Sequence, residues 1–128
     1  MLPSRSRLRR SADIGRVRQR GRRWPHPLIV LFVDKQLDNE SADSRFAFAV
    51  GRHIGKAARR NRVKRRLRES VRLVLDQLEP GYDCLIVARP GASTADYEML
   101  EQAVCQLLMR GGVLKRRGGE SVSEGSQA

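Results

Sequence analysis

The sequence contains few cysteines, no long apolar run and no secretory signal, and each shortage excludes a class of protein. Its two cysteines, Cys84 and Cys105, are spaced neither as a disulfide framework nor as a metal site. Both sit in apolar patterns, so we expect buried, reduced thiols and a cytoplasmic protein. No run approaches the roughly 18 apolar residues of a membrane span, and the basic N-terminus lacks the apolar stretch of a signal peptide. We therefore expect no membrane association.

Groups with which a protein cuts nucleic acid by itself are also scarce. The 14 acidic residues fall mostly in predicted loops or on outer helical faces, without a paired metal-binding motif. No glycine-rich phosphate loop is followed by Lys-Ser or Lys-Thr. His26 lies between prolines, where we expect a surface loop, whereas His53 follows Arg52 at a strand-to-helix junction and is a candidate phosphate contact. We predict no catalytic residue, no metal site and no cofactor bound by the protein alone.

Positive charge is what the sequence has in excess. It has 26 Lys and Arg residues against 14 Asp and Glu residues, which gives a formal net charge of +12. Such an excess favours a polyanionic partner and fast, salt-sensitive association. With 128 residues, 40% of them hydrophobic, the chain is long enough for one domain with a small core.

The charge is concentrated in residues 55–72, which also carry the pattern of a helix. Apolar residues recur at helical spacing: Val63, Leu67, Val71, Val74, Leu75 and Leu78. At 100° per residue they fall within an arc of roughly 120°, so we predict a helix from about Lys56 to Leu78 with one face on a core. The basic residues that flank this arc repel one another instead of pairing, which favours contact with nucleic acid over a merely solvated face.

The rest of the chain predicts a sheet and two further helices. We predict one helix over residues 11–20, capped by Ser11 and Gly21, with Ile14 and Val17 inward and Arg16 and Arg20 outward. Strands are predicted over residues 28–33, 45–50 and 82–89, and a last helix, capped by Ser93 or Thr94, is predicted to end at Gly111. Pro25 and Pro27 exclude a central strand from residues 22–27.

This order predicts an α/β (α+β) two-layer sandwich with one small central sheet and helices mainly on one face. The strands on either side of the basic helix are expected to be parallel neighbours. Residues 1–10 are predicted to be a basic flexible N-terminus, residues 11–117 a single RNA-binding domain and the Gly/Ser-rich residues 118–128 a disordered tail.

Residues 60–68 (Arg-Asn-Arg-Val-Lys-Arg-Arg-Leu-Arg) resemble the signature of the bacterial ribonuclease P protein subunit. Residues 46–57 look like that family's strand and its basic approach to the helix, and residues 81–90 look like the strand that follows. Arg7-Leu8, Ile14, Val17 and Gly21 fall where the family's first helix should be. The resemblance covers residues 7 to 110.

The resemblance implies a noncatalytic protein cofactor of a ribozyme. In that family the RNA subunit uses magnesium to hydrolyse precursor transfer RNA and leave its mature 5′ end. The resemblance implies the order αβββαβα, with a left-handed crossover through the basic helix against the usual rule, and a monomer in a one-protein, one-RNA holoenzyme. The residues expected to bind the RNA subunit are Arg59, Arg60, Asn61, Arg62, Lys64, Arg65, Arg66 and Arg68.

The resemblance also implies a cleft between the sheet and the first helix that takes the single-stranded 5′ leader. The residues expected in this cleft are Ile14, Arg18, Phe32, Phe48, Arg52 and His53. Family members usually carry two aromatic residues on the first helix, where this chain has Ile14 and Arg18, so we expect weaker stacking and more apolar contact. Arg52-His53 stands where the family has Lys-Lys, so one of the two charges becomes titratable.

Three other functions stay open from the residues alone. A structural ribosomal or general RNA-binding protein would have a similar composition and should co-purify with ribosomal subunits. A protein nuclease that acts alone should cleave with magnesium in the absence of RNA, and the scarcity of acidic clusters disfavours it. A DNA-packaging protein should bind duplex DNA with similar affinity.

Overall fold

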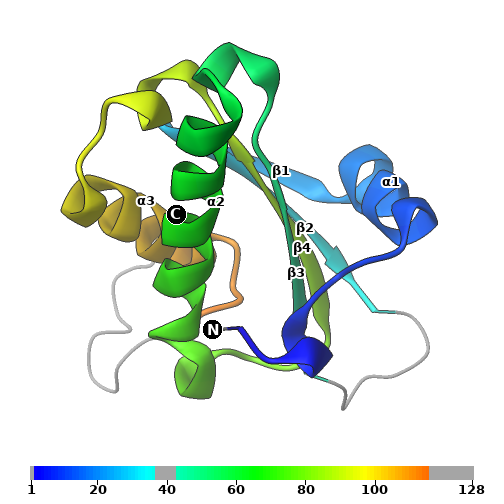
Figure 1. Ribbon diagram of the computed structural model, residues 1–128. Coiled ribbons are helices and arrows are strands. Elements are labelled where there is room, and N and C mark those ends of the chain that lie inside the picture. Colours follow the sequence, from blue (N-terminus) through cyan, green and yellow to red (C-terminus); the bar gives the residue numbers. More distant parts are fainter. Residues whose placement is uncertain (1, 37–42, 116–128) are drawn as a thin grey trace.

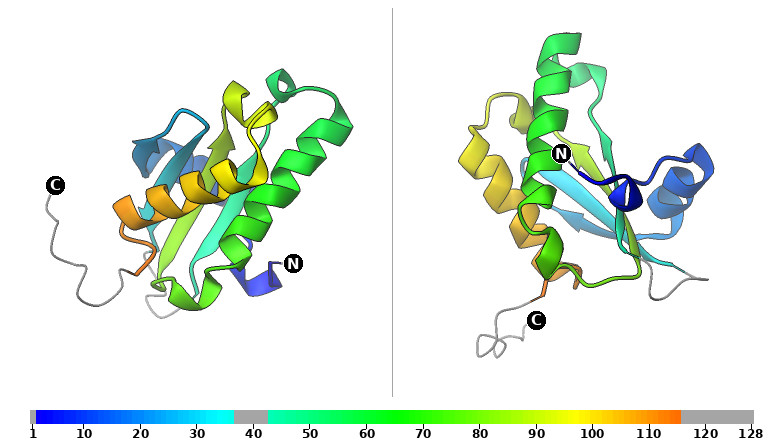
Figure 2. Two further views of the ribbon diagram at one scale, coloured as in Figure 1. Left: turned by 90° about the vertical axis from the view of Figure 1, so that its left-hand side faces the viewer. Right: turned by 60° about the horizontal axis from the view of Figure 1, so that its bottom comes forward.

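A computed structural model describes residues 2–36 and 43–115, which form a sheet with helices on both of its faces (Figures 1 and 2). The strands are β1 (Arg22–Pro25), β2 (Ile29–Lys35), β3 (Arg45–Ala49) and β4 (Tyr82–Ala88). The helices are α1 (Ser11–Arg20), α2 (Ala57–Arg72) and α3 (Tyr97–Arg110). The predicted order αβββαβα is therefore confirmed.

The sheet is mixed, with the strand order β1-β2-β4-β3. β2 pairs antiparallel with β1 and β4, whereas β3 pairs parallel with β4. The prediction of parallel neighbours on either side of the basic helix is confirmed, while the left hand of that crossover stays a prediction. β1 is an edge strand, as expected where Pro25 lacks a backbone donor.

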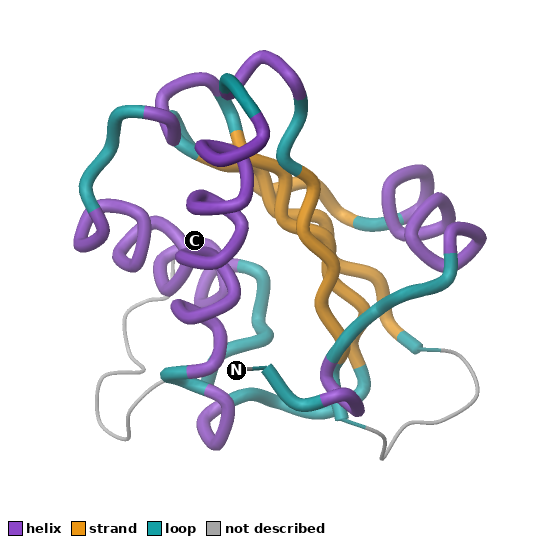
Figure 3. The backbone as a smooth tube through the Cα atoms, viewed as in Figure 1, coloured by secondary structure: helices purple, strands orange, loops and turns teal. Residues whose placement is uncertain are grey.

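The two long helices cover one face of the sheet. Leu31, Phe46 and Ile86 point to that face and are each about 1% exposed, and they pack with Leu67 of α2 and Leu107 of α3. Figure 3 shows these helices on one side of the twisted sheet and α1 on the other. This face holds the larger of the two apolar clusters.

α1 packs on the opposite face, so the expectation of helices mainly on one face holds only for α2 and α3. Val17 of α1 is completely buried there against Ala47 and Leu85. The reason is that β4 is apolar on both faces, with Leu85 and Ile86 each 1% exposed. A strand buried on both sides needs cover on both sides.

The prediction of a flexible N-terminus is wrong for residues 2–10, which wrap around the outer edge of β3. Leu2 is 1% exposed in the cluster under α2, and Leu8 is 4% exposed in the cluster under α1. The Leu8 N–H donates to the Phe46 carbonyl at 2.8 Å. A short 3-10 helix (Ser4–Ser6) lies between them. These residues therefore belong to the domain.

The basic helix ends at Arg72, six residues before the predicted Leu78. Val74 leaves the helical region with φ −118° and ψ 16°, and Leu75–Gln77 forms a 3-10 turn. Leu78 then pairs with Leu114 in an antiparallel bridge. The helical period of residues 74–78 is overridden because this segment bonds to the chain that leaves α3.

The helix caps differ from the prediction at two of four sites. Arg10, not Ser11, is the N-cap of α1, and it makes no side-chain cap hydrogen bond. α3 is capped by Asp96, whose side chain accepts from the Met99 N–H at 2.9 Å. Residues Pro90–Ser93 form a separate 3-10 helix, so Ser93 is too early in the chain to cap α3. Gly21 and Gly111 end α1 and α3 as predicted.

Both cysteines are free, as expected. Cys84 is completely buried, and burial raises the pKa of its thiol well above the ordinary value. Cys105 is only half-buried. No helix within residues 2–36 and 43–115 is long and apolar enough to cross a membrane. The predicted tail of residues 118–128 and part of the predicted loop of residues 35–44 lie outside the described residues.

Candidate nucleic-acid interface

The basic surface of α2 exists because the opposite side of the helix is anchored in the core. Val63, Leu67 and Val71 are 3%, 0% and 0% exposed. A helix held along one stripe must present its other positions to solvent or to neighbouring elements. Figure 1 shows α2 lying across the sheet with its outer side uncovered.

All eight residues predicted to bind an RNA subunit lie on this uncovered part of α2. Four of them, Arg59, Asn61, Arg62 and Arg65, are exposed. The other four, Arg60, Lys64, Arg66 and Arg68, are half-buried at the flanks of the helix. We call this set the α2 stripe.

The first turn of the α2 stripe is held by hydrogen bonds. Arg59 Nη1 donates to the Ser93 carbonyl at 3.4 Å and to the Ser93 hydroxyl at 3.3 Å. Arg60 Nη1 donates to the Gly55 carbonyl at 3.1 Å. Gly55 has φ +137°, a conformation that favours glycine. The turn into α2 therefore aims both guanidinium groups before any ligand arrives.

The charge of the α2 stripe is not neutralised by the carboxylates that the structure describes. Within the described part of the chain no carboxylate forms a salt bridge with any residue of the stripe. The one acidic residue of the helix, Glu69, accepts two hydrogen bonds from Arg72. These hydrogen bonds lower the pKa of the Glu69 carboxyl. An uncompensated row of cations on a rigid helix is suited to a polyanion.

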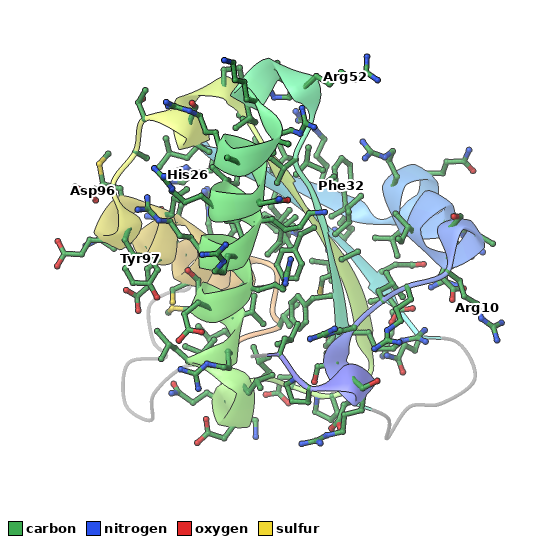
Figure 4. The ribbon with its side chains drawn as sticks, viewed as in Figure 1. Arg10, His26, Phe32, Arg52, Asp96 and Tyr97 are labelled. Atoms are coloured by element: carbon green, nitrogen blue, oxygen red, sulfur yellow. The ribbon has the colours of Figure 1, made fainter. Side chains whose placement is uncertain are left out.

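Three of the predicted cleft residues come together between α1 and the sheet. Ile14 of α1 packs with Phe32 of β2 in the smaller apolar cluster. The Arg18 guanidinium lies 5.9 Å from the centroid of the Phe32 ring. Figure 4 shows Phe32 on the side of the sheet that faces α1. Val87 and Ala49 extend this half-exposed apolar strip across the sheet.

Phe48 does not lie in this cleft, which corrects the prediction. Side chains alternate along β3, so Ala47 faces α1 while Phe46 and Phe48 face α2. Phe48 packs against the cluster under α2 and borders Lys64 and Arg68. The prediction failed because the register of β3 in the sheet, and not its composition, decides which face a ring takes.

Arg52 and His53 lie beyond the end of β3, in the 3-10 helix Arg52–Ile54. Both side chains are exposed, and His53 Nε2 lies 3.3 Å from the Ala88 carbonyl oxygen. Figure 4 shows Arg52 projecting into solvent at this end of the sheet. The two residues therefore lie past the end of the sheet and not on the floor of the cleft.

One predicted outward residue is an anchor of α1 instead. Arg16 donates to the carboxylates of Asp13, Asp34 and Asp83 at 3.1, 3.1 and 2.6 Å. The Asp83 side chain is 1% exposed and also accepts two hydrogen bonds from Arg45 at 2.9 and 2.8 Å. The sequence offers no local signal for most of this network. Except for Asp13, its members lie 18 to 67 positions away from Arg16 in the sequence.

The ionic network fixes the charge state of both arginines. Burial lowers the pKa of Arg16, but the hydrogen bonds to Asp34 and Asp83 outweigh this, and the net direction is upward. The hydrogen bond to Asp83 likewise raises the pKa of Arg45. α1 is therefore tied to β2 and β4 by permanent charges, and the position of the cleft depends on them.

Known proteins resemble this chain over most of its length. The family model described as Ribonuclease P matches residues 2–111. The chain is 44% identical over 104 residues to the ribonuclease P protein component of Herpetosiphon aurantiacus, covering 81% of this chain and 82% of that protein. It is 39% identical over 112 residues to that of Mycobacterium avium, covering 86% and 94%.

Solved structures resemble it as well. The RNase P protein from Thermotoga maritima superposes with a TM-score of 0.72 at 29% identity, covering 83% of this chain and 97% of that one. The RNase P protein of Staphylococcus aureus gives a TM-score of 0.77 at 21% identity, covering 86% and 98%, a likeness that concerns the fold alone. By sequence over residues 2–111, and in keeping with its fold, the chain belongs to the family of bacterial ribonuclease P protein components.

Proposed function

We propose that this chain is the protein cofactor of a ribonuclease P ribonucleoprotein and binds its RNA subunit through the α2 stripe. The observation that supports this most is the row of cations on α2 that no described carboxylate neutralises. In this proposal the RNA subunit carries the catalysis and uses magnesium. One protein binds one RNA in the cytoplasm, and together they remove the 5′ leader of precursor transfer RNA.

The apolar strip under α1 is the proposed binding site for the single-stranded leader. Phe32 offers a ring face and Ile14 an apolar contact, while Arg18 supplies a charge for the backbone. Arg52 and His53, beyond the end of β3, would meet phosphates further along the same strand. A groove with an apolar floor and cationic ends is suited to single-stranded nucleic acid.

The carboxylates nearest the proposed leader site are engaged in ion pairs. Asp13, Asp34 and Asp83 all bond to Arg16. Each of these carboxylates accepts a hydrogen bond from the Arg16 guanidinium, which balances its charge within the protein. This supports a binding role for the protein and chemistry on the RNA.

Reconstitution tests the proposed function. Cleavage of precursor transfer RNA should be measured at low magnesium with the cognate RNA subunit, with the protein, and with both. We expect activity only in the mixture, or far more of it there than with the RNA alone. Activity from the protein alone would mean that it is itself a nuclease. No gain in the mixture, with RNA binding intact, would favour a general RNA-binding protein.

Replacing Phe32 by leucine should weaken binding of precursor with a leader but not of mature transfer RNA. Leucine keeps the apolar contact with α1 and removes the ring, so the loss is stacking energy of about 1 to 3 kcal/mol per base. Holoenzyme affinity for the two RNAs gives the comparison. Arg18→Ala should act in the same direction, whereas Arg20→Ala, an equal loss of charge on α1, should not. Equal losses for both RNAs would contradict the leader assignment.

A further inference from the structure

A groove opens at the outer edge of β3, on the side of that strand away from β4. Its volume is about 240 Å³. Its apolar floor includes Leu8, Ile14, Ala47 and Phe48, and its rim carries Arg7, Arg9, Lys64 and Arg68. We call it the β3-edge groove. It lies between the N-terminal segment and α2, which are far apart in the sequence.

The floor of the groove is incompletely covered. Leu8 and Ala47 are 4% and 7% exposed, but Ile14 and Phe48 are only half-buried. The described N-terminal residues pair with β3 only at Phe46, whose carbonyl accepts from the Leu8 N–H. Backbone groups of alternate strand residues point to the same edge, so the N–H and C=O of Phe48 also face outward. The groove thus offers part of an aromatic ring beside edge backbone groups.

The rim of the groove is positive. Arg7 Nε donates to the Leu2 carbonyl and Arg9 Nη2 to the Ser4 hydroxyl, both neutral acceptors. Within residues 2–36 and 43–115 no carboxylate forms a salt bridge with any of the four rim residues. The complementary ligand carries negative charge and a flat apolar part. A nucleotide has both.

We propose that the β3-edge groove binds one unpaired nucleotide of the RNA subunit. Its base would lie against Phe48, within reach of the outward backbone groups, and its phosphate would be held by Arg9 together with Lys64 and Arg68. The groove shares the apolar Ile14 with the proposed leader site, but it shares two cations, Lys64 and Arg68, with the α2 stripe. Because the cations would hold the phosphate, we assign the nucleotide to the RNA subunit. This inference rests on the proposed function and extends its contact surface beyond α2.

A substitution at Arg9 tests the groove without changing the α2 stripe, because Arg9 belongs to the groove alone, whereas Lys64 and Arg68 belong to both. Arg9→Ala should weaken binding to the RNA subunit about fivefold near 0.1 M salt and lower the salt slope by about 0.7 to 0.9, as expected for one phosphate contact. Arg10→Ala is the matched control. It removes the same charge from the next, equally exposed residue, which points away from the groove (Figure 4). We expect no comparable loss for this variant.

Phe48→Leu tests the base contact independently of charge. It should weaken binding to the RNA subunit about fivefold or more, the lower limit for loss of base–aromatic stacking. The salt slope should not change, because stacking releases no counterions. Circular dichroism and thermal unfolding of this variant show whether its fold is retained, and the Arg9 and Arg10 pair remains informative if it is not.

The binding measurements are made on the full chain with RNA subunit alone, and repeated with precursor and mature transfer RNA present. The groove site would be overturned if Arg9→Ala bound the RNA subunit as tightly as Arg10→Ala and Phe48→Leu bound it as tightly as the wild type. In that case, weak binding of the RNA subunit by alanine variants of the α2 stripe would still support the proposed function without the groove site. A Phe48→Leu loss seen only with leader-bearing precursor would also overturn it, since the leader would then be the occupant. Wild-type protein that does not bind the RNA subunit would refute the proposed function itself.

Discussion

Replacing Arg60, Lys64 and Arg65 together by alanine is expected to weaken binding to the RNA subunit about a hundredfold at 0.1 M salt. Each cation that neutralises a phosphate contributes about 0.7 to 0.9 to the slope of log affinity against log salt. Three lost contacts should therefore lower that slope by about two to three. Affinity measured at four or more salt concentrations gives both quantities from one titration series.

The loss is expected to be specific to α2, because Arg60 is held in position and no described carboxylate pairs with the three cations. Arg60 is aimed by its hydrogen bond to the Gly55 carbonyl, and no described carboxylate forms a salt bridge with Lys64 or Arg65. A side chain that is already held in position loses little conformational entropy when it binds a phosphate, whereas a flexible surface arginine must first be ordered.

A charge-matched variant separates placement from net charge. Arg10, Arg20 and Arg110 are exposed on other elements, and replacing these three by alanine removes the same total charge. We expect this variant to bind within a few-fold of the wild type. Equal loss in the two triple variants would mean that the protein binds RNA through its overall charge, and the α2 stripe would be no more than a solvated helix face.

Local patterns predicted the elements that carry the α2 stripe. The four-residue spacing of Val63, Leu67 and Val71 identified the buried face of α2, and all three are buried. The spacing could not predict where the helix ends. Residues 74–78 keep the helical period, yet they form a 3-10 turn and a bridge to Leu114, because hydrogen bonds to a distant segment compete with the helix.

The cleft was harder to predict because it depends on contacts between distant segments. The structure brings Ile14, Arg18 and Phe32 together between α1 and the sheet, whereas Phe48 lies on the opposite face. A phenylalanine at an edge strand fits either face, and a shift of one residue in register exchanges them. The β3-edge groove was missed for a related reason. Arg7 and Arg9 lie on its rim because the hydrogen bond from the Leu8 N–H to the Phe46 carbonyl holds the N-terminal segment against β3.

Asp83→Asn is expected to destabilise the fold by about 3 kcal/mol. Removing one partner of a buried ion pair typically costs 3 to 5 kcal/mol, and we take the lower end because Arg16 and Arg45 keep side-chain exposures of 27% and 37%. The carboxylate accepts from Arg16, Arg45 and Gln36. An amide in its place offers one acceptor oxygen and turns an NH₂ donor toward the guanidinium donors. Denaturant unfolding should show a lower midpoint with an unchanged m-value.

Asp34→Asn is the matched control for that change. Among the described residues Asp34 bonds only to Arg16, at 3.1 Å, and its side chain is 17% exposed. We expect a cost of about 1.5 kcal/mol, the lower end of the range for one hydrogen bond to a charged group. A cost for Asp83→Asn no larger than for Asp34→Asn would contradict the view that a single buried carboxylate joins α1 to the sheet.

Loss of the Asp83 charge should also act on leader recognition without acting on the RNA subunit. α1 carries Ile14 and Arg18, and Arg16 ties it to β2 and β4 through Asp34 and Asp83. α2 is anchored separately through Val63, Leu67 and Val71 on the other face of the sheet. Below its unfolding temperature, Asp83→Asn should therefore bind the RNA subunit like the wild type but distinguish leader-bearing precursor from mature transfer RNA less well. Equal weakening toward both RNAs would mean that the two faces of the sheet are coupled, and that Asp83 supports the whole domain and not the position of α1.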